Sequence, residues 1–190
     1  MARSDDLHTL PAEIAVPQDD GACAHLPGRP LPSVLLASTS GGPTDLSRIP
    51  GRIVLYAYPR TGRPGQPPLV EDWNLIPGAR GCTPQSCAFR DHHAELAQLG
   101  AAVFGLSTQD THYQREMVER LHLPFPVLSD ARLELATALA LPTFTVAHTI
   151  LIKRLTLIAR EGVIETVFYP VFPPDRNAAD VVAWLRAHPA

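Results

Sequence analysis

The chain has 190 residues, of which 45% are hydrophobic and 18% are charged, and its formal net charge is -3. This length favours one domain with a substantial core, and the composition excludes an intrinsically disordered chain. Because the basic residues are spread along the chain, no basic cluster predicts a nucleic-acid partner or an anionic membrane surface.

The N-terminal segment has no apolar run typical of a secretory signal, and no stretch approaches the roughly 20 apolar residues that span a bilayer. We therefore expect a cytoplasmic protein with no membrane partner. The three cysteines do not indicate a disulfide framework in that reducing compartment. A close pair of cysteines there is more typical of metal binding or redox chemistry.

The first third of the chain predicts an arm, two strands and a long loop. Residues 1–32 are rich in Pro, Asp and Gly and are expected to form an extended arm before a single domain over 33–190. Strands are predicted at 33–38 and 52–59, the second of which is the apolar run "RIVLYAYP". Residues 60–81 predict an irregular loop, and loops of this length inside compact domains are usually functional.

A helix is predicted over residues 83–99. Thr83 is the expected N-cap, Pro84 the first helical residue and Gly100 the residue at which the helix stops.

Strands and helices then alternate to the end of the chain. The predicted elements are a strand (101–107), a helix (108–123), a strand (125–130), a helix (131–141), a β-hairpin that turns at "REG" (153–170) and a final helix (174–188). This order predicts an α/β fold of the thioredoxin-like kind, with a mixed central sheet flanked by helices.

Cys82 directly precedes the predicted N-cap, and Cys87 lies five residues after Cys82, within the predicted helix. Unpaired N–H groups and the helix dipole favour a thiolate at that end, so Cys82 is placed to act as a nucleophile. Five residues of intact helix give a rise of roughly 7.5 Å and a turn of roughly 140°. A disulfide needs Cα atoms within about 7 Å, so this pair can bond only if the first turns of the helix unwind.

Two other interpretations of the pair stay open at this level. A zinc site needs four ligands, whereas the neighbouring His92 and His93 would diverge by about 100° on a helix. The plainer alternative is a pair of unrelated cysteines in the core.

The stretch "GCTPQSCAFRD" resembles the peroxiredoxins, specifically the peroxiredoxin Q or bacterioferritin comigratory protein branch of the AhpC/TSA superfamily. That branch carries Gly-Cys-Thr, a second cysteine five residues after the first, and then Phe-Arg-Asp. Further stretches agree in order, namely "VLYAYP", "VFGLSTQD", "LPFPVLSD" and "KRLTLIAREGVI". The match covers about residues 33–187.

The resemblance implies a thiol peroxidase that reduces hydrogen peroxide and organic hydroperoxides. Cys82 would be the peroxidatic cysteine, which becomes a sulfenic acid, and Cys87 would resolve it as an intramolecular disulfide. Arg154 would support the thiolate and polarise the peroxide. A thioredoxin-like dithiol would reduce the disulfide, with no metal, haem or flavin required. A monomer is expected, although a dimer is compatible with the pattern.

The chain departs from the family pattern just before Cys82. The family usually has Pro-x-x-x-Thr/Ser-x-x-Cys, whose hydroxyl bonds the thiolate and the peroxide. Here Ala79 stands three residues before Cys82, and Pro59 lies 23 residues upstream, which makes the loop 60–81 an insertion. Either Thr61 folds back to supply the hydroxyl, with Pro77 replacing the proline, or Arg154 and backbone N–H groups act alone.

Plainer roles stand beside these. Arg154 also fits a solvated residue, and Cys23 fits a bystander more readily than an alternative resolving thiol. Trp73 either packs the loop down or borders the peroxide entrance. At the level of function, the alternatives are a thiol–disulfide oxidoreductase or peroxide-responsive sensor and a non-enzymatic thioredoxin-like binding domain.

Overall fold

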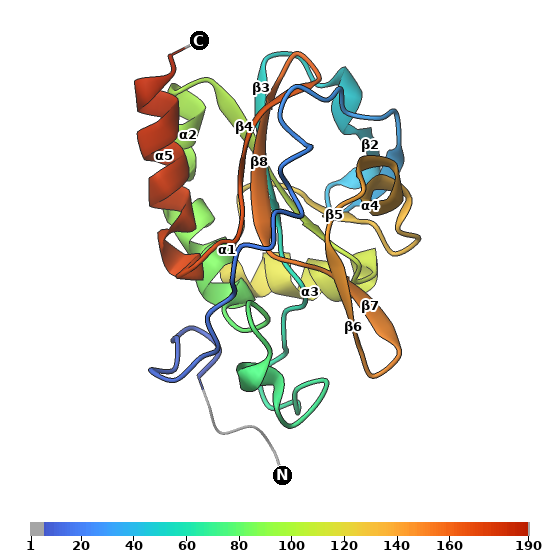
Figure 1. Cartoon of the computed structure of the whole chain (residues 1–190), viewed down its shortest axis with the longest axis vertical. Coiled ribbons are helices and arrows are strands. Elements are labelled where there is room, and N and C mark those ends of the chain that lie inside the picture. Colours follow the sequence, from blue (N-terminus) through green and yellow to red (C-terminus); the bar gives the residue numbers. More distant parts are fainter. Residues whose placement is uncertain (1–5, 190) are drawn as a thin grey trace.

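The structure of the protein is a computed structural model that describes residues 6–189 (Figure 1). A seven-stranded mixed sheet has the strand order β2-β1-β5-β4-β3-β8-β9, and β6 pairs with β7 in a separate ribbon. The strands are β1 (Leu35–Ser38), β2 (Gly41–Asp45), β3 (Arg52–Ala57), β4 (Ala101–Ser107), β5 (Val127–Ser129), β6 (Thr143–Val146), β7 (Thr149–Ile152), β8 (Leu155–Arg160) and β9 (Val163–Phe168). The helices are α1 (Cys82–Asp91), α2 (His93–Gln98), α3 (Thr111–Leu121), α4 (Glu134–Leu139) and α5 (Asn177–Ala187).

The centre of the sheet is parallel and its flanks are antiparallel. β4 runs parallel to both β3 and β5, whereas β8 is antiparallel to β3 and β1 is antiparallel to β5. The predicted α/β fold with a mixed central sheet is confirmed. The predicted hairpin is also confirmed, as β8 and β9.

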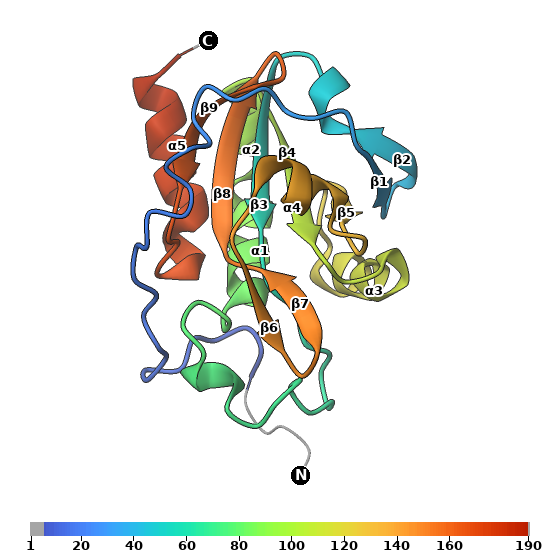
Figure 2. The ribbon, with the colours of Figure 1, turned by 45° about the vertical axis from the view of Figure 1, so that its right-hand side comes forward.

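β3 is buried on both faces, and its side chains divide the core into two layers. Leu55 belongs to the layer that contains α4, whereas Tyr56 belongs to the layer that contains α1 and α5. Figures 1 and 2 show α5 and α4 on opposite sides of the central strands. A run of apolar residues with alternating side chains is what a strand covered on both faces requires.

The N-terminal segment lies along the body of the protein. Residues 1–5 of the predicted arm fall outside the described part of the chain. Leu26 is fully buried in the α4 layer, and the backbone N–H of Leu31 donates to the carbonyl of Gly162 at 2.7 Å. The C-terminal part of the arm therefore contributes to the core of the domain.

The predicted helix 83–99 is wrong in its start and in its continuity. The helix begins at Cys82, and Gly81 is its N-cap, with φ 103°. A Cβ atom on residue 81 would lie 2.3 Å from Cγ of Pro174, so only glycine fits this turn. At the other end, His92 has ψ near 0° and separates α1 from α2.

The loop 60–81 contains one short 3-10 turn, Trp73–Leu75, and packs on the β6–β7 ribbon. Trp73 and Ala79 form a third apolar cluster with Leu151 of β7, against which Phe144 also packs. Figure 1 shows the loop at the same end of the molecule as this ribbon. Sequence periodicity missed β2, β6 and β7, which are short and lack buried alternation. Among residues 6–189, no helix has the length and apolarity to cross a membrane.

Candidate active site

Cys82 is the first residue of α1 and is only 3% exposed. Its Sγ lies 3.2 Å from Nη2 of Arg154, which donates to it. The thiol also lies 3.6 Å from the carbonyl oxygen of Ala79, to which it donates. The sulfur thus combines a helix N-terminus with a buried guanidinium, two features that favour a thiolate.

Arg154 directly precedes β8 and is 3% exposed, so the interpretation of a solvated residue is wrong. Its Nη1 donates to Oε1 of Gln85 in α1. Its Nη2 also donates to three backbone carbonyls of the loop, those of Gly78 (3.1 Å), Ala79 (3.3 Å) and Arg80 (3.0 Å). The buried guanidinium thus joins the Cys82 sulfur to α1 and to the backbone of the loop that precedes it.

A polar chain that the sequence did not predict holds Arg154 in place. Nε2 of Gln85 donates to Oδ1 of Asn177 at 3.0 Å, and the Thr156 hydroxyl donates to the same oxygen at 2.6 Å. All three side chains are at most 2% exposed. The position of Gln85, three residues after Cys82, was a usable signal because residues i and i+3 share a helix face. Nothing local pointed to Asn177.

Cys87 is partly exposed on α1, and both cysteines are free thiols on an intact helix. Burial raises the pKa of the Cys87 thiol, and the charge of Asp91 adds to this, whereas Arg90 opposes it. The helix spacing predicts that Cys82 and Cys87 cannot form a disulfide while α1 is wound, and α1 is wound in this structure. Unwinding itself stays a prediction.

Cys23 lies in a different part of the molecule. It is 2% exposed and packs in the α4 layer, whereas Cys82 packs in the layer on the other face of the sheet. Burial raises the pKa of Cys23 to about 12, and Asp20 contributes in the same direction. The structure does not bring Cys23 to Cys82, and a buried thiol of this kind is unreactive.

A cavity of about 20 Å³ opens beside Cys82. This is close to the volume that one water molecule needs. Thr61 lines it, as do Trp73 and Thr83. Trp73 therefore packs the loop down and also borders the cavity beside the sulfur. Thr83, the predicted N-cap, is the second residue of α1 and a wall of this cavity.

Thr61 is 1% exposed and is held by Gln109, which lies two residues after the end of β4. The Thr61 hydroxyl donates to Oε1 of Gln109 at 3.1 Å, and Nε2 of Gln109 donates to the Thr61 carbonyl at 3.2 Å. Because its proton is engaged, the hydroxyl oxygen is left as an acceptor. Pro77, the expected substitute for the family's proline, lines a different cavity.

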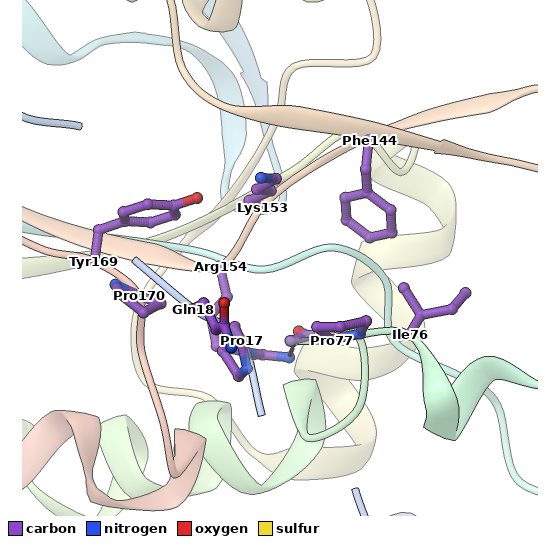
Figure 3. A pocket seen from close by; sticks show the side chains of 10 residues that line it. Pro17, Gln18, Ile76, Pro77, Phe144, Lys153, Arg154, Tyr169 and Pro170 are labelled. Atoms are coloured by element: carbon purple, nitrogen blue, oxygen red, sulfur yellow. Dashed lines mark hydrogen bonds between the residues drawn. The ribbon is translucent and has the colours of Figure 1, made fainter. Parts of the chain in front are cut away.

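That second cavity, of about 240 Å³, lies next to Arg154 and has mostly apolar walls. Figure 3 shows Phe144 and Ile76 on one side of it and Tyr169 and Pro170 on the other, with Arg154 between them. The arm, the loop 60–81, the ribbon and the two segments that flank the β8–β9 hairpin all contribute to its lining.

Within residues 6–189, no group of three or more His, Cys, Asp or Glu side chains is arranged to hold a metal ion. His92 Nδ1 instead lies 3.1 Å from Oε2 of Glu95 on the next turn. The zinc interpretation therefore has no support from the described residues.

A thioredoxin-like sheet, a thiol at a helix N-terminus and a buried arginine on the sulfur define a thiol-dependent redox protein. The redoxin family model matches residues 26–183. The chain is 26% identical to a chloroplastic peroxiredoxin Q of Oryza sativa subsp. japonica over 183 residues, which cover 93% of this chain and 76% of that protein.

Solved structures agree with this. This chain matches the structure of peroxidoxin BcpB of Mycobacterium tuberculosis with a TM-score of 0.71 and 26% sequence identity. The match covers 87% of this chain and 100% of the BcpB chain. Peroxiredoxin Q of Xanthomonas campestris matches with a TM-score of 0.66 at 20% sequence identity, over 92% of this chain and 98% of that chain, and this likeness supports the fold. The chain belongs to the redoxin family, within its peroxiredoxin Q-like branch. It is a thiol peroxidase, and its family implies a peroxide substrate and a thiol reductant such as thioredoxin.

Proposed function

We propose that Cys82 is the peroxidatic cysteine of this peroxidase and that Arg154 is its electrostatic partner. The observation that carries the proposal is the 3.2 Å contact between Arg154 Nη2 and Cys82 Sγ at the buried start of α1. The thiolate attacks the terminal peroxide oxygen, the O–O bond breaks and Cys82 becomes a sulfenic acid, while the departing hydroxide or alkoxide takes up a proton from solvent and leaves as water or an alcohol. Arg154 stabilises the negative charge that develops on the departing oxygen.

Thr61 takes the part of the hydroxyl that Ala79 lacks. Both Thr61 and Cys82 line the 20 Å³ cavity, which is large enough for a molecule close to the size of water. With its proton held by Gln109, the Thr61 oxygen accepts the hydrogen bond of a peroxide O–H. This orients the peroxide toward the sulfur, which is the gain expected from positioning.

Cys87 resolves the sulfenic acid as a Cys82–Cys87 disulfide after the first turns of α1 unwind, and a thioredoxin-like dithiol reduces that disulfide. The unpaired thiols and the five-residue spacing support this assignment. The monomeric state and the cytoplasmic location expected from the sequence stay predictions.

Organic hydroperoxides are substrates as well as hydrogen peroxide. The apolar cavity beside Arg154 offers room for the organic part of such a molecule. A solved relative of the same fold, the bacterioferritin comigratory protein of Xanthomonas campestris, is described by its alkyl peroxide reduction activity.

A stopped-flow peroxide assay on Cys82→Ser and Cys87→Ser tests the cycle. The first variant should consume no peroxide, and the second should react once and then stall or over-oxidise. Full peroxide consumption by Cys82→Ser would remove the proposal, and normal turnover of Cys87→Ser with thioredoxin would remove the resolving role. The site of the disulfide follows from intact mass and peptide mapping after one equivalent of peroxide.

A further inference from the structure

A short turn of the arm, residues 6–10, covers the start of α1. The Arg80 side chain fixes this turn, because its Nη2 donates to the carbonyl oxygens of Asp6 (2.7 Å) and Thr9 (3.2 Å). Within the turn, the backbone N–H of His8 donates to Oδ1 of Asp6 at 2.9 Å. The turn is thus tied to the residue that lies two positions before Cys82.

Successive side chains of the turn face the two cysteines of the site. Leu7 lines the cavity beside Cys82. Nδ1 of His8 lies 4.0 Å from Sγ of Cys87, a long contact that involves the larger sulfur atom. The turn therefore presents an imidazole to Cys87 and lines the cavity at Cys82.

Cys87 needs a base if it is to attack a sulfenic acid. Burial raises the pKa of its thiol, so the unassisted thiol is more protonated near neutral pH than an exposed cysteine. The charged groups around it have opposing effects, because Arg90 and Arg120 favour the thiolate whereas Asp91 disfavours it. Histidine is the side chain that ordinarily exchanges a proton near neutral pH, and His8 is exposed to the water that would receive that proton.

We propose that His8 is the general base of the resolving step and takes the thiol proton of Cys87 before that sulfur attacks Cys82. The inference rests on the proposed resolving role of Cys87. The Cys87 S–H bond breaks and the proton passes to Nδ1 of His8. The resulting thiolate attacks the sulfenic sulfur of Cys82, an S–S bond forms and the S–O bond breaks. The departing hydroxide takes up a proton, so one sulfenic acid and one thiol give one disulfide and one water.

The contact exists in the wound state of α1. Proton transfer then precedes the unwinding that brings the two sulfurs together. A general base can contribute roughly 10²–10⁴-fold to a proton-transfer step, and contacts of this kind are often long before the reactive state forms.

The test follows the two steps separately in His8→Gln after one equivalent of hydrogen peroxide. Rapid-mixing measurements of the loss of the Cys82 thiolate give the rate of the first step. Dimedone trapping with intact mass gives the lifetime of the sulfenic acid. We expect an unchanged first step and a resolving step slowed by at least about tenfold. His112→Gln, an exposed histidine of α3, is the matched control and should resolve at the wild-type rate.

Rescue separates a base from a structural role. Added imidazole should restore the resolving rate of His8→Ala, and raising the pH should restore it as the Cys87 thiol ionises. Wild-type resolution in His8→Gln overturns the inference, and so does a slow variant that neither imidazole nor alkaline pH restores. These outcomes differ from failure of the proposed cycle, in which Cys82→Ser would still consume peroxide or Cys87→Ser would still turn over normally with thioredoxin.

Discussion

Replacing Arg154 tests the electrostatic part of the site most directly. Arg154→Lys keeps the positive charge but loses the planar fork that reaches the sulfur and Gln85 together. A hydrogen bond to a charged group contributes about 1.5–3 kcal/mol, and about 1.4 kcal/mol is tenfold in rate. Loss of the bond to the thiolate should therefore slow the reaction of Cys82 with hydrogen peroxide by roughly 10- to 150-fold.

Arg154→Met removes the charge as well and should be slower still. It also leaves Oε1 of Gln85 and the three loop carbonyls without this donor, so its free energy of unfolding should fall. The Lys variant keeps the rate measurement interpretable if the Met variant does not fold.

Two rates separate an effect of Arg154 on the thiolate from an effect on the departing oxygen: stopped-flow peroxide consumption and iodoacetamide labelling of Cys82. Both rates should fall if Arg154 stabilises the thiolate, whereas only the peroxide rate falls if it acts solely on the departing oxygen. Arg160→Met, at the C-terminal end of β8, removes a partly exposed cation that pairs with Glu165 and should leave both rates unchanged. Wild-type rates in both Arg154 variants would refute the reasoning.

Three further predictions concern the Thr61 hydroxyl, the apolar cavity and the Asp20 carboxylate. Thr61→Val should slow the hydrogen peroxide reaction by roughly two- to tenfold, the value of one neutral hydrogen bond, whereas Thr61→Ser should retain most of the rate; equal rates in stopped flow would exclude the hydroxyl. Ile76→Ser should raise the KM for cumene hydroperoxide and leave that for hydrogen peroxide unchanged, and its neighbour Leu75, which is 70% exposed, gives the control Leu75→Ser; a change for both peroxides would contradict the role of the cavity. Hydrogen bonds from Lys153 and then Tyr169 lower the pKa of Asp20 to about 2, so the stability gained from this carboxylate is present above its ordinary pKa of about 4 and is lost as pH falls through about 2. Urea unfolding of Asp20→Asn against wild type should show a difference above pH 4 that disappears by about pH 2, and a difference that persists in acid would show another cause.

Local patterns determined much of the fold. The apolar run of β3 and the alternation that turns at "REG" identified strands correctly, since a strand buried on both faces and a hairpin each leave a short-range signature. The N-cap is Gly81, two residues before the predicted Thr83, and the packing of Pro174 that leaves no room for a Cβ atom at residue 81 comes from far away in the sequence.

The sequence by itself determined that Cys82 lies at the N-terminal end of a helix, that Cys87 follows on this helix and that Arg154 belongs with them through the family pattern. Only the tertiary structure decided what surrounds the sulfur. Thr61 reaches the cavity because the loop 60–81 folds onto the β6–β7 ribbon, and His8 reaches Cys87 because Arg80 ties down the arm. Such contacts join segments that are roughly 20 to 80 residues apart in the sequence. Hydrophobic periodicity, in contrast, reports only on neighbours within a few residues. Long-range packing therefore decided the environment of the thiol, whereas local sequence decided its place on the helix.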